Sequence, residues 1–162
     1  MSDVPVVFLD LPARAEGVGV VRQALVGVAD GLALDTSILS DAKMAVTEAV
    51  TNCVVHAFPD GDGRFQVEMH ADESSLTVVV RDDGKGMATA DEGRSGTSAL
   101  GLGMPLIAAL SDDFAVDAEP GRGTEVRMSF AYERSADPAD ENPITGGPGE
   151  SGRWELEEPE GV

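Results

Sequence analysis

The segment from Asp41 to Phe58 combines an apolar stripe with three side chains that could do chemistry: Glu48, Asn52 and His56. Residues four apart in an α-helix lie about 40° apart around its axis, so the three form one slanting row. A carboxylate, an amide oxygen and an imidazole in such a row could serve Mg²⁺ and a proton transfer, because Mg²⁺ prefers oxygen ligands and keeps waters and substrate phosphates. A solvated helix face with three unrelated polar residues is the alternative interpretation of this helix alone.

A strand-like run, LTVVV, ends shortly before a glycine-rich segment. Asp82, Gly84 and Gly86 in that segment fit the pattern D-x-G-x-G. A carboxylate at a strand end can accept a hydrogen bond from an adenine amino group, and glycines let the base approach the backbone. A calcium-like or simple turn sequence is the alternative for this segment taken by itself.

Two further glycine segments follow. Gly101 and Gly103 flank Leu102 where a helix is predicted to begin, and the free backbone N–H groups at a helix N-terminus form a ready phosphate site. The run GRGT, which ends at Thr124, precedes the last predicted strand. Its threonine hydroxyl could close the base pocket, or the run could be only a hairpin turn.

Together and in this order, the segments resemble the signature of the GHKL (Bergerat-fold) ATPase superfamily: E-x-x-x-N on a helix, then D-x-G-x-G, then G-x-G, then G-x-G-T. No Walker A or kinase Gly-rich-loop pattern competes with it. Within the superfamily, TEAVTNCVVHAF is similar to the corresponding helix of the anti-sigma-factor serine kinases, and the resemblance extends from Val4 to Tyr132.

The resemblance implies ATP and Mg²⁺ as cofactors. Asn52 would bind Mg²⁺, Glu48 would take the proton from a serine hydroxyl, and Asp82 would recognise the adenine amino group. Lys85, Arg94 and Arg122 are the alternatives for a cation near the terminal phosphate. The nucleotide-binding residues implied are Asn52, Asp82, Gly84, Gly86, Met87, Gly101, Leu102, Gly103 and Thr124.

The same resemblance implies an anti-sigma factor. Such a protein phosphorylates a serine on a STAS-type anti-anti-sigma partner and, as a homodimer, otherwise sequesters a sigma factor. Arg22 falls where the family places a partner-contacting arginine, although a solvated surface arginine would look the same. Two alternatives remain: an ATP-binding sequestration module without kinase activity, and the switch kinase of a stress-signalling complex, which holds no sigma factor.

Composition narrows the setting. The formal net charge is −19, from 30 acidic and 11 basic residues, and such a surface repels nucleic-acid phosphates. The one cysteine, Cys53, excludes a disulfide framework and favours a reducing compartment. No apolar run approaches the roughly 20 residues that cross a bilayer, so we expect a cytoplasmic protein without a membrane anchor.

The predicted elements form a two-layer α+β sandwich, with a mixed, mostly antiparallel sheet and helices on one face, as in the histidine-kinase-like ATPase fold. Residues 1–133 would be the ATP-binding kinase domain, and the acidic, Pro- and Gly-rich residues 134–162 a disordered tail. Within the tail, Trp154 is either part of an inert end or a short docking motif. The strands are expected at 4–11, 64–71, 75–81, 114–118 and 125–132, the helices at 14–30, 35–57 and 102–110, and a functional loop at 82–100.

Overall fold

The computed structural model describes residues 5–58, 62–85 and 103–133. The described strands form one sheet in the order β1-β2-β3-β5-β4, and every pairing between them is antiparallel. The sheet is therefore antiparallel throughout rather than mixed. In chain order the elements are β1 (Val7–Pro12), α1 (Ala15–Gly31), α2 (Thr36–Asn52), the π-helical segment η1 (Cys53–Ala57), β2 (Arg64–Ala71), β3 (Ser75–Asp82), α3 (Gly103–Leu110), β4 (Asp113–Glu119) and β5 (Gly123–Ala131).

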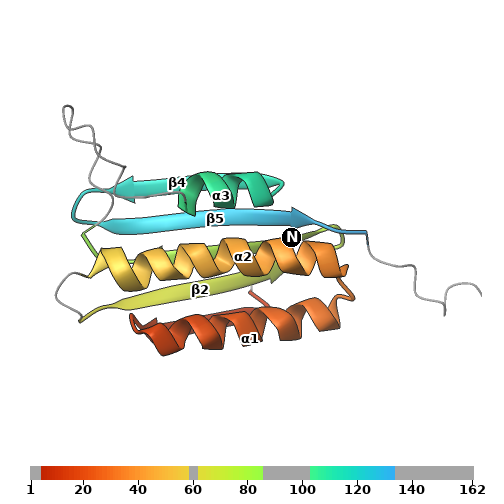
Figure 1. Ribbon diagram of the computed structural model, residues 1–162, viewed down its shortest axis with the longest axis horizontal. Coiled ribbons are helices and arrows are strands. Elements are labelled where there is room, and N and C mark those ends of the chain that lie inside the picture. The colour runs from red at the N-terminus through yellow and green to blue at the C-terminus, as the bar shows by residue number, and fades with distance from the viewer. Residues whose placement is uncertain (1–4, 59–61, 86–102, 134–162) are drawn as a thin grey trace, which may run out of the picture.

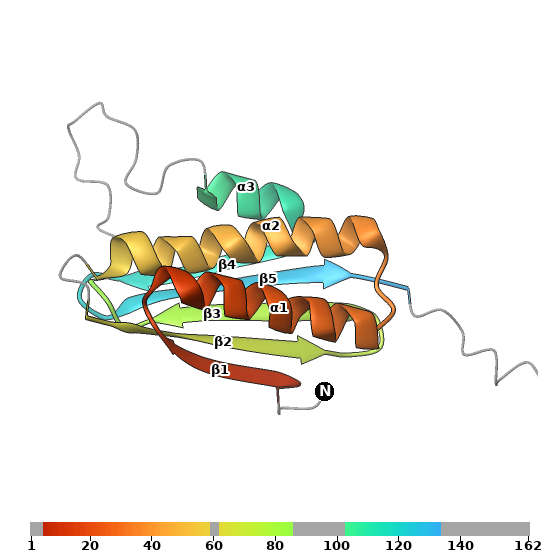
Figure 2. The ribbon, with the colours of Figure 1, turned by 60° about the horizontal axis from the view of Figure 1, so that its bottom comes forward.

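The described helices all lie on one face of the sheet, which confirms the predicted two-layer sandwich (Figures 1 and 2). α1 and α2 run antiparallel to each other across the sheet, and α3 lies beside α2. The core fills the space between the layers. Its largest fully buried side chains include Leu25 and Val46 from the helices and Phe65, Met69 and Phe130 from the strands.

β3 shows how the sequence builds the central strand. Leu76, Val78 and Val80 alternate along it and are buried under the helices, and β-branched residues suit such a pleated, packed surface. Asp82 continues this alternating row at the end of the strand, so its side chain points to the helical face. The strand thus delivers a carboxylate to the edge of the core.

Two boundaries differ from the prediction for a physical reason. β1 extends through Pro12, which is tolerated because an edge strand can lack one N–H donor. The helix expected over 35–57 is α-helical only to Asn52, and the following η1 is π-helical. The wider i→i+5 turn does not continue the predicted row of Glu48, Asn52 and His56, and the His56 side chain is exposed there.

Several predicted features lie outside the described residues: the loop beyond residue 85, the tail at 134–162 and, among the site residues, Gly86, Met87, Gly101 and Leu102. No helix in the described part of the chain combines the length and the apolarity that a bilayer span requires.

Candidate nucleotide site

α2 brings Glu48 and Asn52 against the first residue of α3. A methyl group at Gly103 would lie 3.3 Å from Glu48 Oε2 and 3.4 Å from Asn52 Nδ2. Gly103 is itself buried, so a larger residue would press on both polar side chains. The residues predicted from E-x-x-x-N and from G-x-G therefore meet in space, and the electropositive N-terminal end of α3 lies beside the Glu48 carboxylate.

The Asn52 amide has a property that points to a ligand. Its Nδ2 atom is buried and has no hydrogen-bond partner among the described residues. An unpaired buried polar atom costs about 1–3 kcal/mol, and native structures pair most such atoms with protein, water or a bound group. Asn52 therefore carries unused hydrogen-bonding capacity at the place where the motif predicts a nucleotide and its metal ion.

Asp82 lies on the same side of the sheet and is held by three neighbouring segments. Its Oδ1 accepts a hydrogen bond of 3.0 Å from the Gly84 N–H, and its Oδ2 lies 3.5 Å from the Cys53 thiol. In the sheet, Asp82 pairs with Thr124, the residue predicted to close the base pocket. β3, η1 and β5 thus converge on one carboxylate.

Burial raises the pKa of the Asp82 carboxyl above its ordinary value, although the Gly84 N–H and the Cys53 thiol lower it in part. Burial also raises the pKa of the Cys53 thiol, and the nearby Asp82 charge adds to this effect. The thiol therefore stays protonated, so it can donate a hydrogen bond to the Asp82 carboxylate.

Backbone hydrogen bonds tie the three motifs together at Lys85. Its N–H donates to the Ala57 carbonyl at 3.2 Å, and its own carbonyl accepts from the Gly121 N–H at 2.9 Å. Gly84 packs so closely on Ala57 that a methyl group at Gly84 would overlap the Ala57 backbone. The end of η1, the D-x-G turn and the β4–β5 turn therefore form one connected unit.

The β4–β5 turn depends on glycine backbone geometry. Gly121 and Gly123 have φ angles of 78° and 91°, in the left-handed region that side chains disfavour. A methyl group at Gly123 would also overlap the Asp82 carbonyl oxygen and lie 2.8 Å from its carbonyl carbon. The glycines of G-x-G-T therefore let β5 approach the strand end that carries Asp82.

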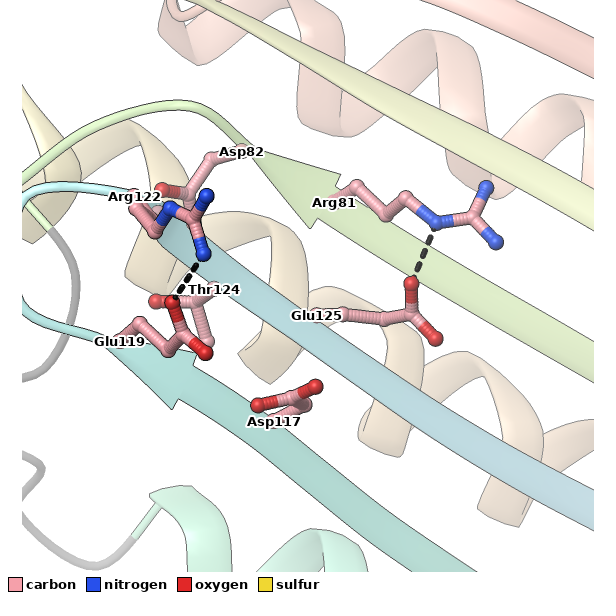
Figure 3. A pocket seen from close by; sticks show the side chains of 8 residues that line it. Arg81, Asp82, Asp117, Glu119, Arg122, Thr124 and Glu125 are labelled. Atoms are coloured by element: carbon pink, nitrogen blue, oxygen red, sulfur yellow. Dashed lines mark hydrogen bonds and ion pairs between the residues drawn. The ribbon is translucent and has the colours of Figure 1, made fainter.

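A cavity of about 360 Å³ lies on the opposite face of the sheet (Figure 3). Its polar lining is mostly paired, since Arg81 contacts Glu125 and Arg122 contacts Glu119, at 2.6 and 2.8 Å. The sequence left Arg122 open as a cation for the terminal phosphate, and the structure instead pairs it with a carboxylate in this cavity. The cavity includes Asp82 and Thr124 among its lining, but the strand alternation and the Cys53 contact place the Asp82 side chain on the helical face.

The described site residues fall into two groups. Glu48, Asn52 and Gly103 meet at the α2–α3 contact, and Asp82, Gly84 and Thr124 gather where β3 and β5 end. Arg22 is exposed on α1, and Lys85 is exposed next to the D-x-G turn. Sequence reasoning missed the contact between the Cys53 thiol and Asp82, because it considered Cys53 only as part of the apolar helix stripe and as a lone cysteine that excludes a disulfide framework.

A comparison of the sequence with known protein families agrees with this site. The site combines a polar helix face, a strand-end carboxylate and glycine turns. The family described as "Histidine kinase-like ATPase domain" matches residues 11–130. The chain belongs to this family. The ATPase domain thus spans nearly all of the described residues, and the resemblance stated from the motifs is confirmed.

Two relatives have sequences similar to that of this chain. The serine-protein kinase RsbW of Listeria innocua serovar 6a is 35% identical over 127 residues, covering 71% of this chain and 81% of that protein. The anti-sigma F factor of Caldanaerobacter subterraneus subsp. tengcongensis is 32% identical over 98 residues, covering 56% and 68%.

The crystal structure of the RsbU and RsbW domains of Rv1364c from Mycobacterium tuberculosis shares the fold. Its TM-score is 0.55 at 17% identity, covering 82% of this chain and 35% of that chain. The ATPase domain therefore corresponds to about a third of that longer protein.

Proposed function

We propose that this chain is an ATP-dependent serine kinase that acts as an anti-sigma factor: it phosphorylates a serine of a STAS-type anti-anti-sigma protein and sequesters a sigma factor. The observation that carries the proposal is the contact of Glu48 and Asn52 with Gly103 at the start of α3. The names of the relatives, serine-protein kinase and anti-sigma F factor, support the same activity.

The residues present fit ATP with Mg²⁺. Asn52 offers an amide whose Nδ2 finds no partner among the described residues, and its Oδ1 is the kind of oxygen that Mg²⁺ prefers. When bound, Mg²⁺ would neutralise charge on the phosphates, and Asn52 would be its protein ligand. The N-terminal end of α3 would add backbone N–H groups toward the phosphates.

The chain's own residues account for the remaining steps. The Glu48 carboxylate would accept the proton of the incoming serine hydroxyl, and the Asp82 carboxylate would accept a hydrogen bond from the adenine amino group. Phosphoryl transfer needs mainly positioning and charge stabilisation, so a rigid pocket with few catalytic groups suffices.

The role of Glu48 is tested by Glu48→Gln, which keeps the shape of the side chain and removes its basicity. We expect transfer of labelled phosphate to a serine of a STAS-type partner to fall by about 10²–10⁴, with ADP affinity unchanged. Asp41→Asn, an exposed change two turns earlier on α2, is the matched control and should leave both quantities unchanged.

Equal phosphate transfer by wild type and Glu48→Gln would remove Glu48 from its role. A wild-type chain that binds ADP and a sigma factor but labels no serine would favour the sequestration module. A chain that phosphorylates its partner but captures no sigma factor would instead be the switch kinase.

The partner surface and assembly also belong to this proposal. Arg22 is exposed on α1, where a partner could contact it, and a sigma-factor partner would place the chain in the cytoplasm. We propose a homodimer as the working assembly. Light scattering of the purified chain would measure its mass directly, and a monomer at micromolar concentration would contradict this part.

A further inference from the structure

We propose that Cys53 is a positioning residue for base recognition: its thiol fixes the orientation of the Asp82 carboxylate and so sharpens the preference for adenine. This inference rests on the proposed function, because it takes Asp82 as the residue that reads the base. The inference adds Cys53, whose side chain contacts the Asp82 carboxylate, to the residues of the base site.

The contact geometry supports a directed hydrogen bond. Cys53 Sγ lies 3.5 Å from Asp82 Oδ2 and 3.4 Å from the Ala49 carbonyl oxygen on its own helix. A thiol has one proton, so the two acceptors compete for it. A carboxylate is the stronger acceptor because hydrogen bonds to charged groups are stronger than those to neutral groups. The Cys53 thiol therefore donates its hydrogen bond mainly to Asp82 Oδ2.

The burial of Cys53 increases the importance of its hydrogen bond to Asp82. Cys53 is 4% exposed, so little water can replace the thiol as a donor. The other carboxylate oxygen, Oδ1, accepts from the Gly84 N–H. With the Gly84 N–H on Oδ1 and the Cys53 thiol on Oδ2, rotation of the carboxylate is restrained. The Thr124 backbone N–H is a third donor to this carboxylate, and a remaining lone pair stays directed at the incoming base. An alanine at position 53 would remove the thiol donor from Oδ2.

Cys53 lies where the helix geometry changes. Cys53 is the first residue of η1, where the α-helix changes to a π-helical turn. π-helical turns are rare and are found frequently at functional sites. Asn52, the residue before it, lies against α3, whereas Cys53 faces the end of β3. Adjacent residues of one helix thus serve the predicted metal ion and the predicted base.

The experiment compares the affinities of ADP and inosine diphosphate, both with Mg²⁺, by calorimetry. Inosine diphosphate carries a carbonyl oxygen in place of the amino group that Asp82 would read. We expect Cys53→Ala to lower the ADP-over-inosine-diphosphate preference by about three- to tenfold, the range of one modest hydrogen bond. Cys53→Ser, which keeps a donor, should retain more of the preference than Cys53→Ala.

Two further variants separate positioning from packing. Val46→Ala removes a fully buried side chain from the same helix two turns earlier, and it should lower stability without changing the base preference. In an Asp82→Ala background, Cys53→Ala should have no further effect on the preference, because the partner of the thiol is gone. Urea unfolding of each variant confirms that it is folded.

Some outcomes overturn the inference alone. An unchanged preference in Cys53→Ala would do so, as would a Cys53→Ser variant that behaves like Cys53→Ala, or an equal loss in the Asp82→Ala background. In each of these cases a wild-type chain that still prefers ADP leaves the proposed function standing. A wild-type chain that binds neither nucleotide overturns both.

Discussion

Replacing Gly123 with alanine tests how closely β5 must approach the strand end that carries Asp82. The φ angle of Gly123 is 91°, and an added methyl group would overlap the Asp82 carbonyl oxygen and lie 2.9 Å from the Asp83 Cα. These neighbours are main-chain atoms, so they cannot rotate away as a side chain would. Gly121 in the same turn has a φ of 78° and open space around it, and it is the matched control.

The two substitutions differ in one physical cost. Alanine in the left-handed region costs about 1–2 kcal/mol at either position. At Gly123 the steric overlap adds about 1–3 kcal/mol, the usual cost of overpacking, for a total of about 2–5 kcal/mol. Domains of this kind have about 5–15 kcal/mol of stability, so we expect both variants to fold.

Urea unfolding gives the stability of each variant, and ADP titration gives the state of the pocket. Gly123→Ala should lose more unfolding free energy than Gly121→Ala. It should also weaken ADP binding by about tenfold, because a shifted Asp82 loses about 1.4 kcal/mol of its contact with the base. Equal unfolding free energies in the two variants would refute the steric argument, and undiminished ADP binding would refute the link to Asp82.

Two further predictions concern pH. Burial raises the pKa of Asp82, so the folded chain holds that proton more tightly than the unfolded chain, and stability falls as pH rises from the ordinary Asp range through the folded pKa. Asp82→Asn should therefore have a higher urea midpoint than wild type at pH 7, with an advantage that shrinks toward pH 4; a lower midpoint at pH 7 would contradict this. Desolvation alone would raise the pKa of Glu68, but hydrogen bonds from His70 and Arg81 outweigh it and lower that pKa. The stability that the Glu68–Arg81 pair contributes is therefore present above the ordinary Glu range and lost as pH falls below it. Arg81→Met should make the fall in urea midpoint between pH 5 and pH 3 shallower, and an equally steep fall would count against the pair.

Much of the fold follows from patterns that act locally. The apolar stripe of the second helix and the β-branched run before Asp82 specify their elements, because each must bury one face. The pairing of Glu48 and Asn52 on one helix face follows from helical spacing alone. Their contact with Gly103 could be expected only from the family resemblance, because the two segments are about fifty residues apart in the chain.

Other features lie beyond sequence patterns. The π-helical turn at Cys53–Ala57 has the same apolar periodicity as the helix before it, so nothing in the composition marks the change. Cys53 fits an apolar stripe equally well whether or not its thiol reaches a carboxylate. Arg122 pairs with Glu119 three residues earlier, a contact set by the turn geometry rather than by a helix or strand repeat.

The hydrogen bonds at Lys85 have a consequence for how this chain can vary. Both bonds use main-chain atoms, the N–H toward Ala57 and the carbonyl toward Gly121. Every amino acid except proline supplies both groups. The residue type at this position can therefore change while the hydrogen bonds between the helix end and the turn are kept. Related sequences could therefore look unlike one another here and still share the same local architecture.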